Sequence, residues 1–367
     1  MVLFFLCTLS RLLRFITSKF RRFDKRDVRH NSVLVVEPNA YHGCVLPGVA
    51  RYFGELGYNV DVLCRAEVFL EDPFINFAHT ADAPRIFTGN AKQLTEWLLS
   101  LTGNEYEYVF FSSPPSEPLM KSANIISRTK ANGGVILLRH QVDDSSVVPE
   151  GVKSSFALIS HHGVPMLNPH YFGEFEPKVY PSKTVKFVAI GEVVGKCKNH
   201  RLLIDAADQL VQRGITNFGV SVIGKMHWKD KVKVPRHLKR YIKFTGWLDF
   251  ERMYAKVNAS DFILALLDPT NPEHDRYKES VVTGSLSLSI GFRKPLVVSE
   301  PFAAFLGLDR SNSILYPGNS LLEAMSSALH IVESGYSELT KGVSALASRV
   351  YQTSLENLRT ATLSYVV

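Results

Sequence analysis

The stretch KFVAIGEVVGKCKNHRLLIDAADQL, residues 186–210, reads as a strand, a loop and a helix in direct succession. Lys186 to Ile190 form a largely apolar run that ends at Gly191, which predicts a buried strand. Apolar residues then recur at helical spacing, at Leu202, Leu203, Ala206, Ala207 and Leu210. Lys198 stands at the start of this helix, where an ammonium beside free helix N–H groups would suit an anion. The alternative interpretation is a solvated lysine near a helix start.

A second strand-to-helix loop occurs in YKESVVTGSLSLSIGFRKPLVVSE, residues 277–300. Thr283, Gly284 and Ser285 precede an apolar helix, and Pro295 stops that helix before a further strand. Thr and Ser cap helices well, and Gly lets a ligand approach the backbone closely. An oxyanion there would gain about 0.3–2 kcal/mol from the helix dipole. An ordinary capped helix is the alternative, but two such loops in one domain favour a diphosphate site.

The rest of the chain repeats the alternation of strands and helices, with a helix expected at Lys121–Lys130 and a strand expected at Asp261–Leu267. A strand at 31–37, a helix at 49–56 and a strand at 58–63 form a β-loop-α-β unit, which predicts parallel pairing. We expect an α/β fold of two doubly wound Rossmann-like domains facing across a cleft, with ligands beyond the carboxyl strand ends. The predicted parts are an N-terminal helix at 1–30, domains at 31–172 and 173–336, and a C-terminal helix at 337–367 that could pack back on the first domain. Neither half carries G-x-G-x-x-G or a Walker A sequence, which disfavours dehydrogenase and P-loop functions.

Composition narrows the class of protein. The chain has 367 residues, 46% of them hydrophobic and 21% charged, as globular proteins do. Its four cysteines lie far apart without C-x-x-C spacing, so we expect neither a zinc site nor a disulfide framework. No run of 18 or more apolar residues occurs, and no membrane-spanning segment is predicted.

The basic charge gathers at the N-terminus. Residues 1–30 hold eight Lys and Arg against two Asp, a net charge of +6, and the whole chain carries +7. The rest of the chain is therefore nearly neutral, and we do not expect it to bind nucleic acid. On a helical wheel, residues 1–26 place apolar side chains on one face and arginines on the other, which predicts a helix lying on an anionic membrane surface. The alternatives are a helix packed on this protein or a sister subunit, and a cleaved or spanning signal.

An ordered series of motifs runs through residues 186–330. It comprises Gly191 with Lys198-Asn199, Ile223-Gly224, Phe244 with Gly246, Leu248 and Tyr254, Ala259 with Asp261, and Gly284 to Ile290 leading into Lys294-Pro295-Leu296-Val297. By this series the second domain resembles glycosyltransferases of the GT-B fold, most closely the group-1, family 4-like clade. The first domain resembles them more loosely, through Gly43 and through Gly57-Tyr58 with Val60 and Val62.

The resemblance implies a role for each domain. The C-terminal domain would bind a nucleotide sugar, with Lys198 and Gly191 at the diphosphate and the backbone of Thr283, Gly284 and Ser285 around it. Glu279 would lie near the donor ribose or sugar. His140 or His42 would face the acceptor as a base or a hydrogen-bond donor. The alternative for both histidines is a surface or a satisfied core position. No metal or other cofactor is implied.

The chain departs from the family at one motif. The retaining clade has two Glu, seven and fifteen residues before the proline matched by Pro295, and those positions here hold Leu288 and Ser280. Glu279 is one residue from the second position, so the stereochemistry is left open.

We expect a glycosyltransferase on the inner, cytoplasmic face of the membrane that uses a nucleotide-diphosphate sugar. It would extend a glycan or lipid-linked acceptor in cell-surface polysaccharide synthesis. The alternatives are a non-catalytic GT-B-like scaffold subunit and a sugar-nucleotide epimerase or hydrolase. The donor base, the sugar, the acceptor and the oligomeric state stay open.

Overall fold

The structure is a computed structural model that describes residues 28–77, 83–142, 148–161, 163–176, 178, 183–193, 197–226 and 232–363. The chain forms two compact units. The first runs to Glu174 and takes up the chain again from Thr353, and the second is Phe175–Gln352. The amphipathic helix predicted over residues 1–26 lies outside the described residues.

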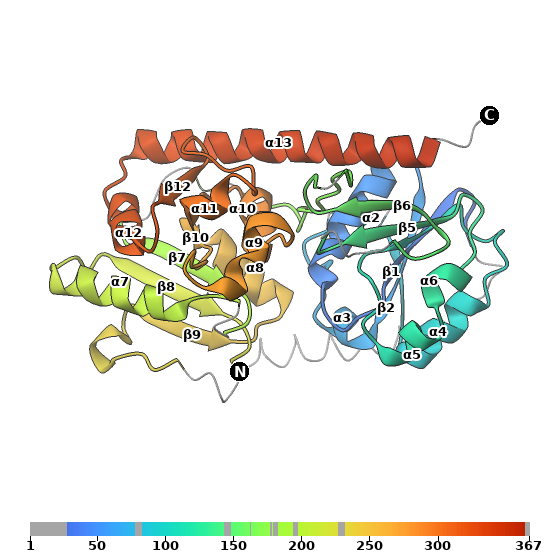
Figure 1. The fold of residues 1–367 in the computed structure, drawn as a ribbon, viewed down its shortest axis with the longest axis horizontal. Helices are drawn as coiled ribbons and strands as arrows, with labels where there is room; N and C mark the ends of the chain where they lie inside the picture. The colour runs from blue at the N-terminus through green and yellow to red at the C-terminus, as the bar shows by residue number, and fades with distance from the viewer. Residues whose placement is uncertain are drawn as a thin grey trace. The chain divides into compact units, whose positions relative to one another are not determined.

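Unit 1 is built on a parallel sheet, which Figure 1 draws in blue to green. Within the described residues its six strands follow the order β3-β2-β1-β4-β5-β6. They are β1 (Ser32–Glu37), β2 (Asn59–Arg65), β3 (Arg85–Gly89), β4 (Tyr108–Phe111), β5 (Val135–Arg139) and β6 (Val152–Ala157). The intervening helices are η2 (Gly43–Val45), α2 (Leu46–Glu55), α3 (Ala66–Leu70), α4 (Ala91–Leu99), α5 (Pro118–Ser122) and α6 (Ile125–Arg128).

Successive side chains of each strand point to opposite faces of this sheet, and helices cover both faces. Val109 and Phe111 of β4 share one core cluster with side chains of α4, α5 and α6. Phe110 points the other way, and its ring meets Phe53 of α2 edge-on with centroids 5.5 Å apart. Because successive strand residues face opposite sides, a run of apolar residues such as YVFF requires cover on both sides.

Unit 2 repeats the plan. Its described strands follow the order β12-β11-β10-β7-β8-β9, and all of the pairs are parallel. They are β7 (Val185–Ile190), β8 (Phe218–Ile223), β9 (Ile242–Gly246), β10 (Phe262–Leu264), β11 (Leu296–Ser299) and β12 (Ser313–Tyr316). The helices are α7 (His200–Gln212), η4 (Arg236–Leu238), α8 (Phe250–Asn258), η5 (Pro272–His274), α9 (Arg276–Glu279), α10 (Gly284–Phe292), α11 (Glu300–Ala303), α12 (Leu321–Leu329) and α13 (Glu333–Leu363).

Two layers of helices cover the second sheet as well. Leu203 of α7 and Met325 of α12 belong to one core cluster with Phe187 of β7 and Phe262 of β10. Residues of α10 approach β7, β10 and β11 instead, and Phe292 at its end packs on Phe175 with ring centroids 4.5 Å apart. The prediction of two doubly wound α/β domains is therefore confirmed.

Two predicted elements are corrected by backbone conformation. The helix predicted from Lys121 to Lys130 is wrong, because Asn124 adopts a left-handed conformation with φ 47° and separates α5 from α6. The strand predicted from Asp261 to Leu267 is shorter and ends at Leu264, and Leu266 has φ 53°. At that point the chain leaves the sheet to join the loops at its carboxyl edge.

Helix α13 packs very closely on unit 2 at one glycine. A Cβ added at Gly342 would lie 1.9 Å from the carbonyl oxygen of Ser311, which leads into β12. Only hydrogen fits there, so this position fixes how the helix meets the loop before the edge strand.

We predict that Gly342→Ala lowers the free energy of unfolding by about 1–3 kcal/mol, the usual cost of overpacking. Chemical denaturation followed by circular dichroism would measure it. Gly54→Ala in α2 is the matched control, because a Cβ there meets nothing within 4 Å. That control should be neutral or stabilising by up to about 1 kcal/mol. Equal effects of the two substitutions would contradict the close packing.

Candidate functional site

Each sheet has one point at which the strand order reverses. In unit 1 the chain builds β2 and β3 to one side of β1 and then crosses to β4 on the other side. In unit 2 the same reversal lies between β7 and β10. Ligands of doubly wound proteins bind beyond the carboxyl strand ends at such points. The predicted residues Gly191 and Lys198 follow β7, and His42 follows β1.

Lys198 joins the loops after β7 and β10 to the start of α10. Its Nζ donates to the carbonyl oxygen of Ala265 at 2.7 Å and to Oγ of Ser285 at 3.0 Å. Among the described residues no carboxylate lies within ion-pair distance of this ammonium. Burial without a counter-ion lowers the pKa of Lys198 to about 8. The structure thus brings Lys198 and Ser285 together, while their diphosphate role stays a prediction.

Asn199 holds the lysine in place from the next position. Its side-chain oxygen accepts from the backbone N–H of Leu202 and caps α7. Its amide donates to Oδ2 of Asp268 at 2.8 Å, and its own N–H donates to the carbonyl oxygen of Leu266 at 2.8 Å. The helix cap and the two hydrogen bonds of Asn199 to the loop after β10 together fix the backbone position of Lys198.

Glycines permit backbone contact between neighbouring loops. Gly191 has φ 133° and Gly224 has φ 156°, which other residues adopt at a cost. A Cβ at Gly224 would lie 1.8 Å from the carbonyl oxygen of Gly191. At Gly284, the first residue of α10, a Cβ would meet nothing within 4 Å, and the residue is exposed. The predicted glycines therefore have different roles. Gly224 lets its loop touch the loop of Gly191 through the backbone, and Gly284 leaves the start of α10 accessible.

Thr283 caps α10 as the sequence indicates. Its hydroxyl oxygen accepts from the N–H of Ser285 at 3.4 Å, a long bond, while the side chain itself is buried. The exposed backbone at Gly284 stands beside this cap, so an anion could reach the helix N-terminus there.

Glu279 does not join this group. It is exposed and makes no hydrogen bond or ion pair with any residue that the structure describes. Nothing in the described structure joins it to Lys198 or Ser285, and its predicted place near the donor sugar stays a prediction.

Arg276, in the same short helix, is a residue that the sequence analysis missed. Its Nη2 donates to the hydroxyl of Tyr277 at 3.1 Å and lies 3.9 Å from Sγ of Cys197, the neighbour of Lys198. Its Nε is buried with no partner, and no described carboxylate pairs with it. A single Arg in a polar segment does not stand out in the sequence, because only the folded structure shows that no described carboxylate pairs with it.

The two predicted histidines of unit 1 form a pair. The rings of His42 and His140 lie with centroids 4.1 Å apart and 39° between their planes. Burial, with a contribution from His140, lowers the pKa of His42 to about 3, and burial lowers the pKa of His140 as well. Both rings are therefore neutral at pH 7.

A carbonyl group selects the tautomer of His140. Its Nε2 lies 2.8 Å from the backbone oxygen of Ser112, which follows β4. A carbonyl oxygen can only accept, so Nε2 carries the hydrogen and Nδ1 keeps its lone pair. Nδ1 of His140 is thus the basic atom of the pair.

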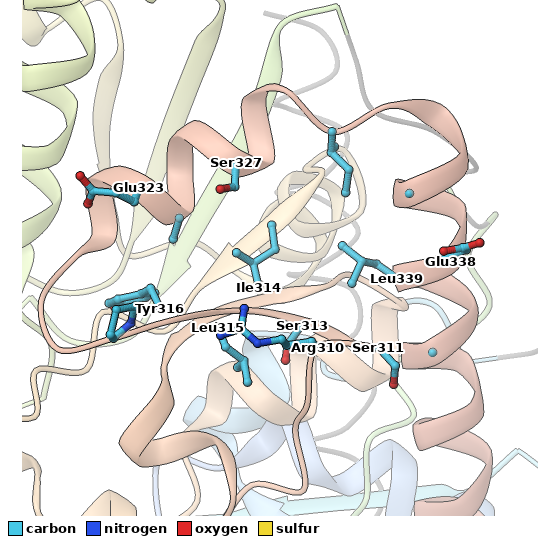
Figure 2. A pocket seen from close by; sticks show the side chains of 15 residues that line it. Arg310, Ser311, Ser313, Ile314, Leu315, Tyr316, Glu323, Ser327, Glu338 and Leu339 are labelled. Atoms are coloured by element: carbon cyan, nitrogen blue, oxygen red, sulfur yellow. The ribbon is translucent and has the colours of Figure 1, made fainter.

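A separate cavity of about 600 Å³ lies beside the edge strand β12. In Figure 2, Glu323 and Ser327 of α12 and Glu338 and Leu339 of α13 flank Ile314 of β12. None of the predicted site residues lines it. No cluster of three or more potential metal ligands occurs in the part of the chain that the structure describes.

Comparison with known proteins identifies the architecture. No family model matches the chain, and no curated protein matches its sequence. Anabaena HepE, solved with UDP and glucose, is similar in structure with TM-score 0.56 and 13% identity over 90% of this chain and 99% of that one. AviGT4, a glycosyltransferase of avilamycin A biosynthesis, gives 0.51 and 14% over 90% and 96%. TarM gives 0.50 and 11% over 75% and 59%.

The chain has the GT-B fold. At these identities the likeness establishes the fold and leaves the chemistry to be argued from the residues. Among the described helices, none combines the length and the hydrophobicity that crossing a bilayer requires.

The state of Lys198 makes anion binding depend on pH. A bound anion favours the ammonium form, so we predict that UDP affinity falls as pH rises from 7.5 to 9, through the free pKa of about 8. Isothermal titration calorimetry would show up to about a tenfold loss per pH unit above 8. Lys198→Met should bind weakly and lose this dependence. A wild-type affinity that is constant over this range would refute the assignment.

Proposed function

We propose that this protein is a glycosyltransferase that moves a sugar from a nucleoside diphosphate to a hydroxyl group of a glycan or lipid-linked acceptor. The observation that carries the proposal is the unbalanced charge at the switch point of unit 2. Lys198 is buried there, Arg276 is half-buried with its Nε shielded from water, and no described carboxylate pairs with either. Desolvated cations without a counter-ion are costly unless a ligand supplies the negative charge.

The charge requirement of the reaction matches these groups. The bond between the anomeric carbon and the β-phosphate oxygen breaks, and the diphosphate leaves with the bonding electrons. The acceptor oxygen forms the new bond to the anomeric carbon, and its proton passes to Nδ1 of His140. Lys198, Arg276 and the helix start at Gly284 would stabilise the leaving diphosphate electrostatically. The reaction so drawn requires no metal ion.

We infer a uridine diphosphate donor as the first candidate. HepE was solved with UDP and with UDP-glucose, and it shares the fold over 90% of this chain. The transferred sugar, the stereochemistry and a place in cell-surface polysaccharide synthesis are further parts of the proposal that rest on the sequence resemblance.

A non-catalytic scaffold is the second candidate, and one observation favours it. Glu279 is exposed without a described partner, and Ser280 and Leu288 occupy the positions at which the retaining clade has Glu. A scaffold would keep the nucleotide site and lose turnover. UDP binding without release of UDP from UDP-sugars, over a broad acceptor panel, would establish this alternative.

We predict that Lys198→Ala lowers turnover of the UDP-sugar about 10²–10³-fold, the usual loss when one stabilising group is removed from a developing charge. Arg276→Gln should weaken UDP binding about tenfold, as removal of one charge-assisted hydrogen bond does. The release of UDP and calorimetric binding would measure the two effects.

Arg252→Gln is the matched control for both variants. This exposed arginine pairs with Asp249 at the start of α8, so its loss should leave UDP binding and turnover near wild type. Full activity of Lys198→Ala would refute the role of the lysine. Equal losses in Arg252→Gln and Arg276→Gln would indicate a general charge effect in place of a site.

We also propose that residues 1–26 attach the protein to the inner, cytoplasmic face of the membrane. Support comes from the sequence, because helical spacing places the apolar residues on one face of this segment and the arginines on the other. Such attachment would keep the enzyme beside a lipid-linked acceptor.

Deletion of residues 2–22 should release the protein from vesicles that contain anionic lipid, and high salt should weaken binding of the full chain. Sedimentation with vesicles would measure both. UDP binding should survive the deletion, which shows that the remaining chain is folded. A truncated protein that sediments as well as the full chain would contradict the attachment.

A further inference from the structure

Glu37 is a buried carboxyl group without a cation. It closes β1 at the switch point of unit 1 and is 0% exposed. No described Lys or Arg lies within ion-pair distance of it. The groups that face it are Asn39, Ser112 and Ser113, with the thiols of Cys44 and Cys64 close enough to respond to its charge. Burial raises the pKa of Glu37 to about 7 against the hydrogen bonds that it accepts.

One carboxyl oxygen of Glu37 accepts in every state. Oε1 receives the backbone N–H of Asn39 at 2.9 Å and the hydroxyl of Ser113 at 2.8 Å. The side-chain amide of Asn39 donates to Oγ of Ser113 at 2.8 Å, which leaves the Ser113 proton for Glu37. A proton on the carboxyl group therefore belongs on Oε2.

The other oxygen can exchange roles with Ser112. Oε2 lies 2.7 Å from Oγ of Ser112, and this Oγ lies 3.0 Å from the carbonyl oxygen of Val36. When Glu37 is ionised, the Ser112 hydroxyl donates to it. When Glu37 is protonated, Oε2 donates to Ser112 and the Ser112 hydroxyl turns to Val36. Neither state leaves a buried donor without an acceptor, so the carboxyl group can titrate inside the fold.

Ser112 also connects Glu37 with the histidine pair. Its backbone carbonyl accepts Nε2–H of His140 at 2.8 Å, and its hydroxyl meets Glu37. A histidine that takes up a proton becomes a cation in a site that burial makes unfavourable for charge. A carboxylate one residue away compensates that cation, as an oriented acid does for a general base.

We propose that Glu37 is a positioning residue whose carboxylate, acting through Ser112, holds the Nε2–H tautomer of His140 and stabilises the imidazolium formed when Nδ1 takes the acceptor proton. The proposal rests on the transferase function inferred above. Cys44 and Cys64 stay protonated thiols, since burial first and the Glu37 charge second raise both pKa values, that of Cys44 to about 12. The titrating groups of the cluster are thus Glu37, His42 and His140.

Glu37→Gln is a close mimic of the protonated state. The amide oxygen accepts from Asn39 and Ser113, and the amide nitrogen donates to Ser112 as the protonated acid would. We expect wild-type kcat to fall as pH drops through 7, since Glu37 then loses its charge. In Glu37→Gln we expect kcat to lie about 10–100-fold lower at pH 8, the range seen when the hydrogen-bond partners of metal-binding histidines are removed. The fall of kcat near pH 7 should be absent. KM for the donor should not change.

Ring ¹⁵N NMR of the histidines gives a readout independent of turnover. The His140 signals are assigned by their loss in His140→Gln. We expect them to report the Nε2–H tautomer and to shift near pH 7 in the wild type, and the shift to be absent in Glu37→Gln. Ser113→Ala should move this shift to higher pH, because the Glu37 carboxylate loses the hydrogen bond from Ser113 and its pKa rises.

The outcomes separate the two proposals. Identical His140 titrations in wild type and Glu37→Gln would overturn the role of Glu37, whatever the enzyme does. The role of Glu37 would also be overturned if Glu37→Gln changed donor KM and kcat together and kcat still fell near pH 7. A wild type that binds UDP, shows the His140 shift and transfers no sugar would overturn the transferase function and leave the coupling intact.

Discussion

The ammonium of Lys198 ties the carboxyl edge of the second sheet together. It reaches from the loop after β7 to the carbonyl of Ala265 and the hydroxyl of Ser285, so three segments meet on one side chain. Neutral oxygens hold it, and they satisfy its hydrogen bonds while leaving its charge uncompensated. The short strand β10, the cap of α7 at Asn199 and the open start of α10 are all arranged around that contact.

The amino ends of the two sheets show the opposite arrangement. Asp61 is fully buried beside Arg29 and Arg85, and Asp261 is fully buried beside Lys178. The buried carboxylates are thus paired where each sheet begins, although Nζ of Lys294, ahead of β11, is buried there with no hydrogen-bond partner in the described part of the chain. At the carboxyl edges Lys198 and Glu37 stay without an opposite partner among the described residues. Because buried charge is costly, the paired carboxylates Asp61 and Asp261 hold the fold, whereas Lys198 and Glu37 keep a charge that is available for chemistry.

The sequence predicts elements better than it predicts the state of single side chains. Apolar runs located most strands, the helical spacing of apolar residues located α7, and the polar cap located the start of α10, because burial and capping act over a few neighbouring residues. Local propensity could not reveal that Asn124 interrupts a helix or that the chain leaves β10 early. Lys198 and Ser285 were expected to converge, and they touch. Arg276 and Glu37 were missed, since a missing counter-ion is a property of the packed structure.

Helix α13 has a consequence for how the chain acquires its structure during synthesis. Its last part belongs to the unit that the chain began more than three hundred residues earlier. There the carbonyl of Thr362 accepts from the hydroxyl of Tyr108, and the hydroxyl of Ser354 accepts from the N–H of Asn168. A ribosome delivers these partners only after the whole of Phe175–Gln352, so the first unit stays incomplete while the second is made and folds. The first unit is therefore completed only after the second has been made, and a chain broken off before α13 would leave the first unit without the partners of Tyr108 and Asn168.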